Sequence, residues 1–240
     1  MPLESPEFSH WVREAESVAK SGRWEAANNL IVKLCANPGP AGPSWVQMVA
    51  SLCASTFSEY LSLKRAFDDP KSDSSLLAWR ARNLLELSVW SIYCSRSREN
   101  TLRLFADGGR DVLNLFAAFE RWTQIVNKAP VEQADLEVVG REKRELAERA
   151  ALQGIESLEG AYMQVSDAAK EIGMGANFAV ANKMLSKFAH PTAMQILAPP
   201  GEPEKLALQK QLFFSHGCLF FKGAFDALEV QLIQAAADFR

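Results

Sequence analysis

Large apolar side chains recur every three or four residues along almost the whole of this 240-residue chain. That spacing places them on one side of an α-helix, whereas a half-buried strand needs alternation at every second residue. Sustained alternation is nearly absent, and the one hairpin-like dipeptide, Asp107-Gly108, has helical sequence on both sides. The pattern therefore predicts an all-α protein, a bundle of long helices with an N-terminal helical hairpin.

Prolines and glycines divide this pattern into segments, because proline cannot continue a helix and glycine often ends one. Residues 131 to about 172 are charge-dense and predict a solvated helical region interrupted near Gly154 or Gly160. A short helix follows Gly175 and should stop at His190, since the residue before Pro191 is pushed out of the helical region. The other predicted helices cover residues 6–21, about 24–37, 44–68, 75–95, 98–127 and 203–238.

The segment 98–127 contains two adjacent glycines, Gly108 and Gly109, yet its apolar register runs through them without a shift. Glycine in a helix interior costs about 1 kcal/mol, so a broken helix is the alternative. We expect one continuous helix in which the glycines allow close contact with a neighbouring segment.

The first 42 residues resemble a single tetratricopeptide-type helical hairpin. Gly22, Trp24 and Ala27 stand at positions that resemble those of such hairpins. No second copy follows at the expected period, and a repeat array needs about three units. We therefore divide the chain into a hairpin appendage over residues 1–42 and a helical bundle over residues 43–240.

Composition narrows the classes of function. The net charge of −3 supplies no bulk attraction for nucleic acid or anionic lipid. No uncharged stretch reaches the roughly 20 residues that a membrane span needs, and no signal peptide is recognisable at the N-terminus, so we expect a cytoplasmic protein without membrane association. Scattered cysteines without metal-ligand spacing predict reduced core thiols, and we expect no metal or cofactor. These cysteines are Cys35, Cys53, Cys94 and Cys218.

Two places put polar groups on helices that are otherwise apolar. On the central helix, Arg82 and Glu86 are four residues apart and share a face, which predicts either a register-fixing ion pair or a site-lining pair. Near the end of a later helix, Asn182, Ser186 and His190 follow at successive steps of four. A histidine at that position can titrate near neutral pH, or it can cap the helix.

The segments Ala81-Arg82-Asn83-Leu84-Leu85-Glu86 and Leu185-Ser186-Lys187-Phe188-Ala189-His190-Pro191-Thr192 together resemble bacterial helical domains allied to the HEPN superfamily. The resemblance covers about residues 75–197 and rests on an Arg-x-x-x-Glu helix followed by a Ser-x-x-x-His helix end. It implies a helical bundle, often dimeric, and in some members a role in RNA cleavage or phage defence. Active ribonucleases of that superfamily carry Arg-x4-6-His, and no arginine occupies that window before His190. Lys210 and His216 have the spacing but not the arginine.

Three hypotheses of function follow. Because no complete catalytic set is present, the leading one is a HEPN-like helical protein, non-enzymatic or catalytically unproven, that binds a protein partner or forms a homodimer. The second is a metal-independent ribonuclease in which His190 acts on RNA, Lys183 or Lys187 contacts phosphate, and Arg82, Glu86 and Ser186 complete the candidate site. The third is a bundle that binds a small molecule between aromatic helices near Trp90, Phe116 and Phe178.

Overall fold

The computed structural model of the chain describes residues 6–38, 42–127, 133–155, 158, 163–190, 192 and 202–237. Every regular element in these ranges is an α-helix, which confirms the predicted all-α class. The helices are α1 (Pro6–Lys20), α2 (Arg23–Ala36), α3 (Pro43–Asp68), α4 (Ser74–Arg96), α5 (Arg98–Asn127), α6 (Gln133–Leu152), α7 (Val165–Glu171), α8 (Gly175–Ala189) and α10 (Pro203–Ala237).

The ends of these helices follow from local residue chemistry. Gly22 precedes α2 with φ of 74°, a left-handed conformation that favours glycine. Asp73 caps α4 by accepting a hydrogen bond from the backbone N–H of Leu76 at 2.9 Å. That bond lowers the pKa of Asp73, because it stabilises the carboxylate form.

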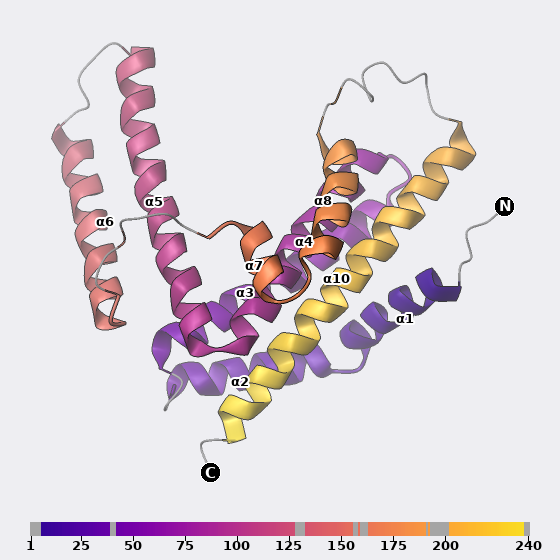
Figure 1. Cartoon of the computed structure of the whole chain (residues 1–240), viewed down its shortest axis with the longest axis horizontal. Coiled ribbons are helices and arrows are strands. Elements are labelled where there is room, and N and C mark those ends of the chain that lie inside the picture. Colours follow the sequence, from indigo (N-terminus) through magenta and orange to yellow (C-terminus); the bar gives the residue numbers. More distant parts are fainter. Residues whose placement is uncertain are drawn as a thin grey trace.

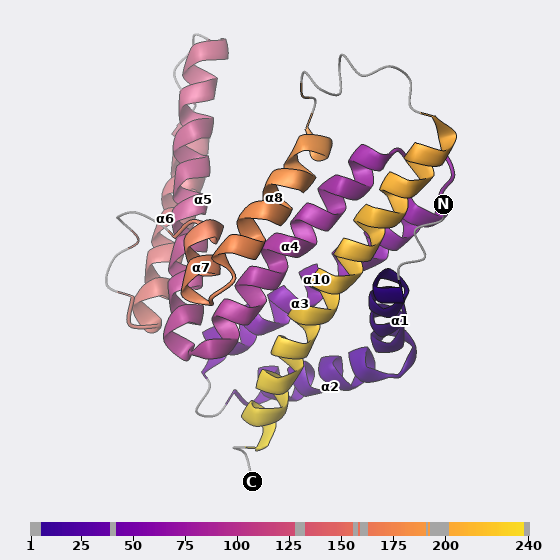
Figure 2. The same ribbon diagram turned by 45° about the vertical axis from the view of Figure 1, so that its right-hand side comes forward.

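Helix α4 lies in the middle of the bundle, as its apolar residues predict. It packs against α3, α8 and α10, with further contacts to α5 and α7. Figure 2 shows α8, α4 and α10 running side by side. One stripe of α4 between α3 and α8 remains partly open, and it carries Trp79, Asn83, Glu86 and Trp90.

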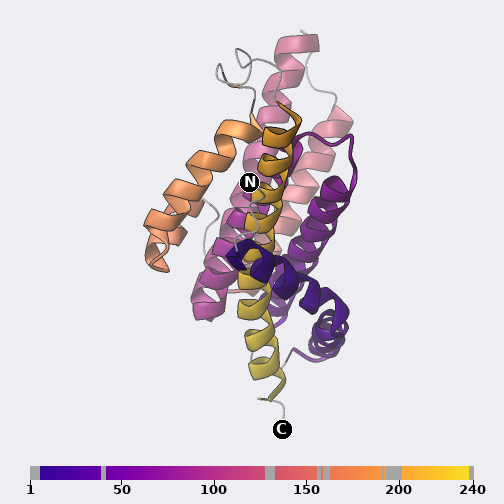
Figure 3. The ribbon, with the colours of Figure 1, turned by 90° about the vertical axis from the view of Figure 1, so that its right-hand side faces the viewer.

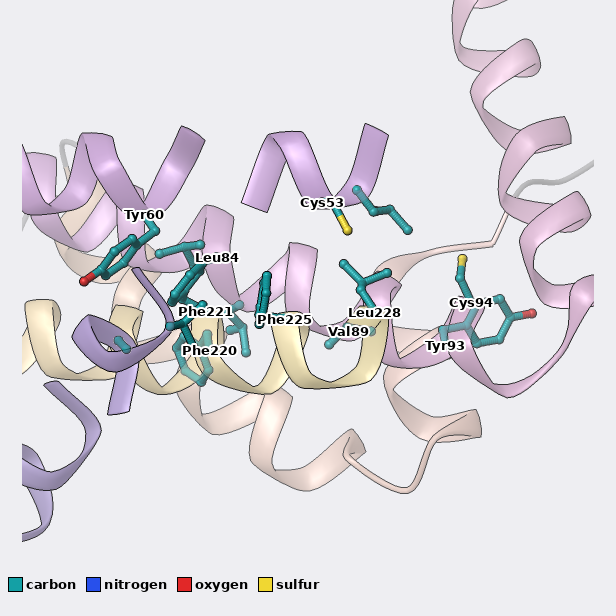
Figure 4. Packing of buried hydrophobic residues seen from close by; sticks show 14 of the residues in the cluster. Cys53, Tyr60, Leu84, Val89, Tyr93, Cys94, Phe220, Phe221, Phe225 and Leu228 are labelled. Atoms are coloured by element: carbon teal, nitrogen blue, oxygen red, sulfur yellow. The ribbon is translucent and has the colours of Figure 1, made fainter. Parts of the chain in front are cut away.

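The core is a continuous cluster of apolar side chains between α3, α4 and α10. Phe221 of α10 is fully buried and stacks on Tyr60 of α3, with 4.1 Å between the ring centroids. Figure 4 shows these two rings gathered beside Leu84 of α4, while Leu228 lies next to Val89 further along. Each buried aromatic side chain of this kind removes roughly 150–250 Å² from water.

The N-terminal helices pack mainly on α10, and α1 lies across it (Figure 3). Their buried residues, among them Val18, Ala27 and Leu34, belong to the same apolar cluster as the rest of the core. Arg23 at the start of α2 donates to Asp226 of α10 at 2.9 Å and also binds Glu229. The helices before and after residue 42 share one apolar core. The division of the chain into a hairpin and a bundle at that residue stays a prediction from the sequence.

Helix α5 is continuous through Gly108-Gly109, as predicted. A Cβ atom at Gly109 would lie 3.0 Å from Leu158, so this glycine does allow a close contact, whereas Gly108 faces open space. The second half of α5 extends with α6 beyond the body, and we call residues 110–127 and 133–152 the arm (Figure 1). The predicted break after α6 occurs at Gly154, which has φ of 75°. The other predicted break, Gly160, lies outside the described residues.

The arm departs from one expectation of the sequence. Val112 and Phe119 belong to the apolar stripe that defines the helix, yet both are exposed in the structure. Near Gly109 the stripe is covered by Leu146 and Leu158. No helix in the described part of the chain has the length and apolar character needed to cross a membrane.

Three of the four cysteines are buried core residues, as predicted, but Cys35 near the end of α2 is exposed. Burial raises the pKa of Cys53, Cys94 and Cys218 to about 12, because the thiolate form is poorly solvated there. Cys35 lies on the outer side of an amphipathic helix, where apolar context in the sequence does not imply burial.

We predict that a thiol reagent labels only Cys35 in the folded protein at pH 8, and all four cysteines after denaturation. The thiolate is the reactive form, and the three buried thiols are both inaccessible and protonated. Mass spectrometry of peptides after iodoacetamide treatment measures this directly. Labelling of Cys53 or Cys218 at the rate of Cys35 would contradict the described core.

Candidate functional site

Arg82 of α4 contacts predicted site residues on α4 and on α8, two helices that are far apart in the sequence. These residues form one polar cluster. Its Nε donates to Oδ1 of Asn182 at 3.0 Å, and its Nη1 lies 3.1 Å from Nε2 of His190. Its Nη2 lies 2.9 Å from Oε1 of Glu86. We call Arg82, Glu86, Asn182, Ser186 and His190 the α4/α8 cluster.

Helical geometry explains how each member reaches the cluster. Arg82 and Glu86 are one turn apart on α4, while Asn182, Ser186 and His190 stand at successive turns of α8. Ser186 Oγ donates to Asn182 Oδ1 at 3.3 Å. His190 is the residue at which α8 ends, and its backbone is extended as expected before a proline. The two sets of residues therefore line the seam between α4 and α8.

The hydrogen bonds in the cluster define its chemistry. Arginine is always a donor, so Nε2 of His190 accepts from Arg82 and carries no proton in this arrangement. The carboxylate of Glu86 balances the charge of Arg82, and both side chains are about one third exposed or less. The cluster acts as a polar joint that fastens the end of α8 to α4. Its negative carboxylate also opposes the approach of a phosphate.

The lysines and the other histidine of the predicted site lie elsewhere. Lys183 and Lys187 are exposed on α8, and neither ammonium bonds to the cluster among the described residues. Lys210 donates to the backbone carbonyl of Asp69 at 3.1 Å. His216 contacts the carbonyl of Leu212 at 2.8 Å and lies among aromatic rings of α1 and α10, so it belongs to the packing of α1 on α10.

On the α3 side of α4, a groove of about 620 Å³ opens along the same stripe. Its lining residues are Ala54, Ser55, Ser58, Glu59, Asn83, Glu86, Leu87 and Trp90, and we call it the α3/α4 groove. Sequence reasoning identified Glu86 and Trp90 here but missed Glu59 and Asn83. The small residues of α3 were the available signal, since they leave space between two packed helices.

Other site types receive no support from the described residues. Within them, no group of three histidine, cysteine, aspartate or glutamate side chains lies close enough to hold a metal ion. The three aromatic residues of the small-molecule hypothesis do not share a cavity that we describe: Trp90 lines the α3/α4 groove, Phe178 is buried in the core, and Phe116 lies on the arm.

Comparisons with known protein families, with curated proteins and with solved structures find no match to this chain. The class of protein is therefore defined by the structure alone: an all-α bundle with a polar joint between α4 and α8, an open groove between α3 and α4, and a two-helix arm. The resemblance to HEPN domains stays a prediction.

Proposed function

We propose that this chain is a non-enzymatic binding protein that works through its arm, and that a second copy of the same chain occupies the arm. The observation that supports this is a stripe of large apolar side chains on the outer face of α5. The stripe consists of Val112, Leu115, Phe119, Trp122 and Ile125, exposed by 40%, 67%, 52%, 55% and 66%.

Spacing and size both indicate a contact surface. The first four residues follow one another by three, four and three positions, so they form a single line along the helix. Phe119 and Trp122, each about half exposed, together present roughly 200 Å² of apolar surface. Contiguous patches of a few hundred Å² on a monomer are often interaction sites.

A two-helix arm cannot bury its own apolar residues on both helices. Leu136 and Val138 of α6 are also exposed, at 42% and 49%. Pairing two arms through these faces forms a four-helix bundle, the arrangement in which such stripes become a shared core. The α5 stripe is about 20 Å long and would lie at the centre of such an interface, and a standard interface buries about 800 Å² per partner.

The ion pairs of α6 are made within α6 and with α5. Lys143 pairs with Glu120 of α5 at 3.4 Å, and Arg141 lies 3.9 Å from Glu145 one turn away. The exposed stripe itself contains no charged residue, so it selects an apolar partner surface over a nucleic acid. The same surface on a second copy matches it in length and character, as two-fold interfaces require.

We predict that the protein is a dimer at tens of micromolar and that Phe119→Glu raises the dissociation constant by about 100-fold or more, because the interface would bury an unpaired charge. Light scattering after size exclusion, across a dilution series, measures the proportions of monomer and dimer. Val180→Glu is the matched control, since Val180 is 72% exposed on α8 and lies outside the arm.

A wild-type protein that stays monomeric at about 100 μM, a concentration on the order of the dissociation constant of a weak dimer, would overturn this proposal. So would a Val180→Glu variant that dissociates as readily as Phe119→Glu. Circular dichroism of each variant shows whether the helices remain intact. The ribonuclease hypothesis and the cytoplasmic location stay predictions, and we do not favour the former because Glu86 balances Arg82 within the cluster.

A further inference from the structure

The α3/α4 groove exists because large side chains meet small ones across the two helices. On α3 the lining residues are Ala54, Ser55 and Ser58, whereas α4 contributes Leu87 and Trp90 opposite them. Small residues over more than one turn leave the space between the helices unfilled. The resulting volume, about 620 Å³, falls within the usual range of small-molecule sites.

Two of the lining residues, Glu59 and Asn83, are hydrogen-bonded to each other, and Glu59 also binds Arg80. Arg80 Nη1 reaches both carboxylate oxygens of Glu59, at 3.2 and 3.0 Å, and Asn83 Nδ2 donates to Glu59 Oε1 at 3.2 Å. Arg80 also lies over the ring of Trp79, with 4.5 Å from its guanidinium carbon to the ring centroid. Glu59 is therefore satisfied, and Arg80 is held at the rim of the groove.

The groups that remain available in the groove are mainly acceptors. Glu86 uses Oε1 for Arg82, which leaves Oε2 without a partner among the described residues. Asn83 has its amide nitrogen engaged, so its carbonyl oxygen is the free end. The hydroxyls of Ser55 and Ser58 also have no partner in the described part of the chain. All three guanidinium nitrogens of Arg82 are engaged, by Asn182, His190 and Glu86, and Arg80 is paired with Glu59 through Nη1.

The polar groups available in the groove favour one class of ligand over others. A carboxylate or phosphate ligand would meet two glutamates, and no lysine or arginine is among the lining residues of the groove. An ammonium group would meet acceptors, and Trp90 in the lining supplies an aromatic ring, which attracts cations. Trp90 is held in place by an edge-on contact with Tyr93, with 6.0 Å between ring centroids.

We propose that the α3/α4 groove binds a protonated organic amine. Glu86 and the carbonyl oxygen of Asn83 accept hydrogen bonds from the ammonium group. Trp90 and Leu87 contact the apolar body of the same ligand, and Ser55 and Ser58 leave room for it. This site is separate from the arm, so it does not depend on the proposed dimer.

Calorimetric titration with three matched probes tests the proposal: 2-phenylethylammonium, 2-phenylethanol and 2-phenylacetate. They share one apolar body and differ in charge. We expect the amine to bind with a dissociation constant on the order of 1 mM or tighter, and the carboxylate to bind at least about tenfold more weakly.

Two variants and a control separate the site from the fold. Glu86→Gln should weaken amine binding by about tenfold while keeping the shape of the side chain. Ser58→Leu should abolish binding by filling the groove without touching an ion pair. Glu148→Gln, an exposed glutamate of α6, should change nothing.

Equal binding of the three probes would overturn the proposal, as would amine binding that survives both Glu86→Gln and Ser58→Leu. Absence of saturable amine binding would also overturn it. Because Ser58→Leu leaves the Arg82 ion pair intact, the test still decides the matter if Glu86→Gln fails to fold. Light scattering on the same samples shows whether the dimer is present, which keeps the two proposals distinguishable.

Discussion

Gly217→Ala should lower the free energy of unfolding by about 1–3 kcal/mol, although alanine is the better helix former. A Cβ atom at position 217 of α10 would lie 2.2 Å from Cδ2 of Leu63 and 3.4 Å from Cδ1 of Leu84. Both leucines are fully buried, so neither can turn toward solvent to make room. Chemical denaturation followed by circular dichroism gives the change.

The same helix supplies a control with the opposite expected sign. At Gly223 a Cβ atom would meet Ser88 Oγ at 3.7 Å, an ordinary contact. Gly223→Ala should therefore be neutral or stabilising by up to about 1 kcal/mol. Leu63→Ala should relieve the clash, so adding Gly217→Ala to that background should cost little. If Gly217→Ala lowers the free energy of unfolding equally in the wild-type and the Leu63→Ala backgrounds, the contact with Leu63 is not the cause of the loss.

Phe221→Ala should destabilise the protein by about 3–5 kcal/mol, the largest effect that we expect from one substitution. The ring of Phe221 is fully buried against Tyr60, Phe57 and Phe225, so its removal leaves a cavity between α3 and α10. For a chain of this size, each kcal/mol corresponds to roughly 2–4 °C in Tm.

Val230→Ala on the same helix is the comparison for this second prediction. Val230 is 50% exposed, so its truncation should cost well under 1 kcal/mol. Differential scanning fluorimetry and denaturant titration measure both variants. A loss for Phe221→Ala no greater than that for Val230→Ala would mean that α10 does not form the centre of the core.

Helix type and length were predictable because the relevant signals are local. Pro203 starts a helix in the structure as it does in the sequence, Gly22 separates the first two helices in both, and α3 begins at Pro43, one residue before the predicted start. The i,i+4 spacing of Arg82 and Glu86 predicted their ion pair for the same reason. A local pattern of this kind reports which face of a helix is apolar.

What covers an apolar face is not a local property. The spacing of Val112 and Phe119 matches that of buried helices, yet both are exposed on the arm. The α3/α4 groove depends on which residues of α3 come to lie opposite Trp90, and that register is set by packing between distant segments. The convergence of His190 with Arg82 was suggested by a family resemblance, and their hydrogen bond appears only in three dimensions.

The placement of α10 has a consequence for biosynthesis. α10 packs against α1, α2, α3 and α4, yet it follows all of them in the chain. At common translation rates roughly 10–40 s separate the emergence of residue 6 from that of residue 203. During that interval the nascent helices lack the partner that completes their shared interior. The exposed leucines and phenylalanines of these helices can then bind chaperones or aggregate. We therefore expect the core to form only after α10 has left the ribosome.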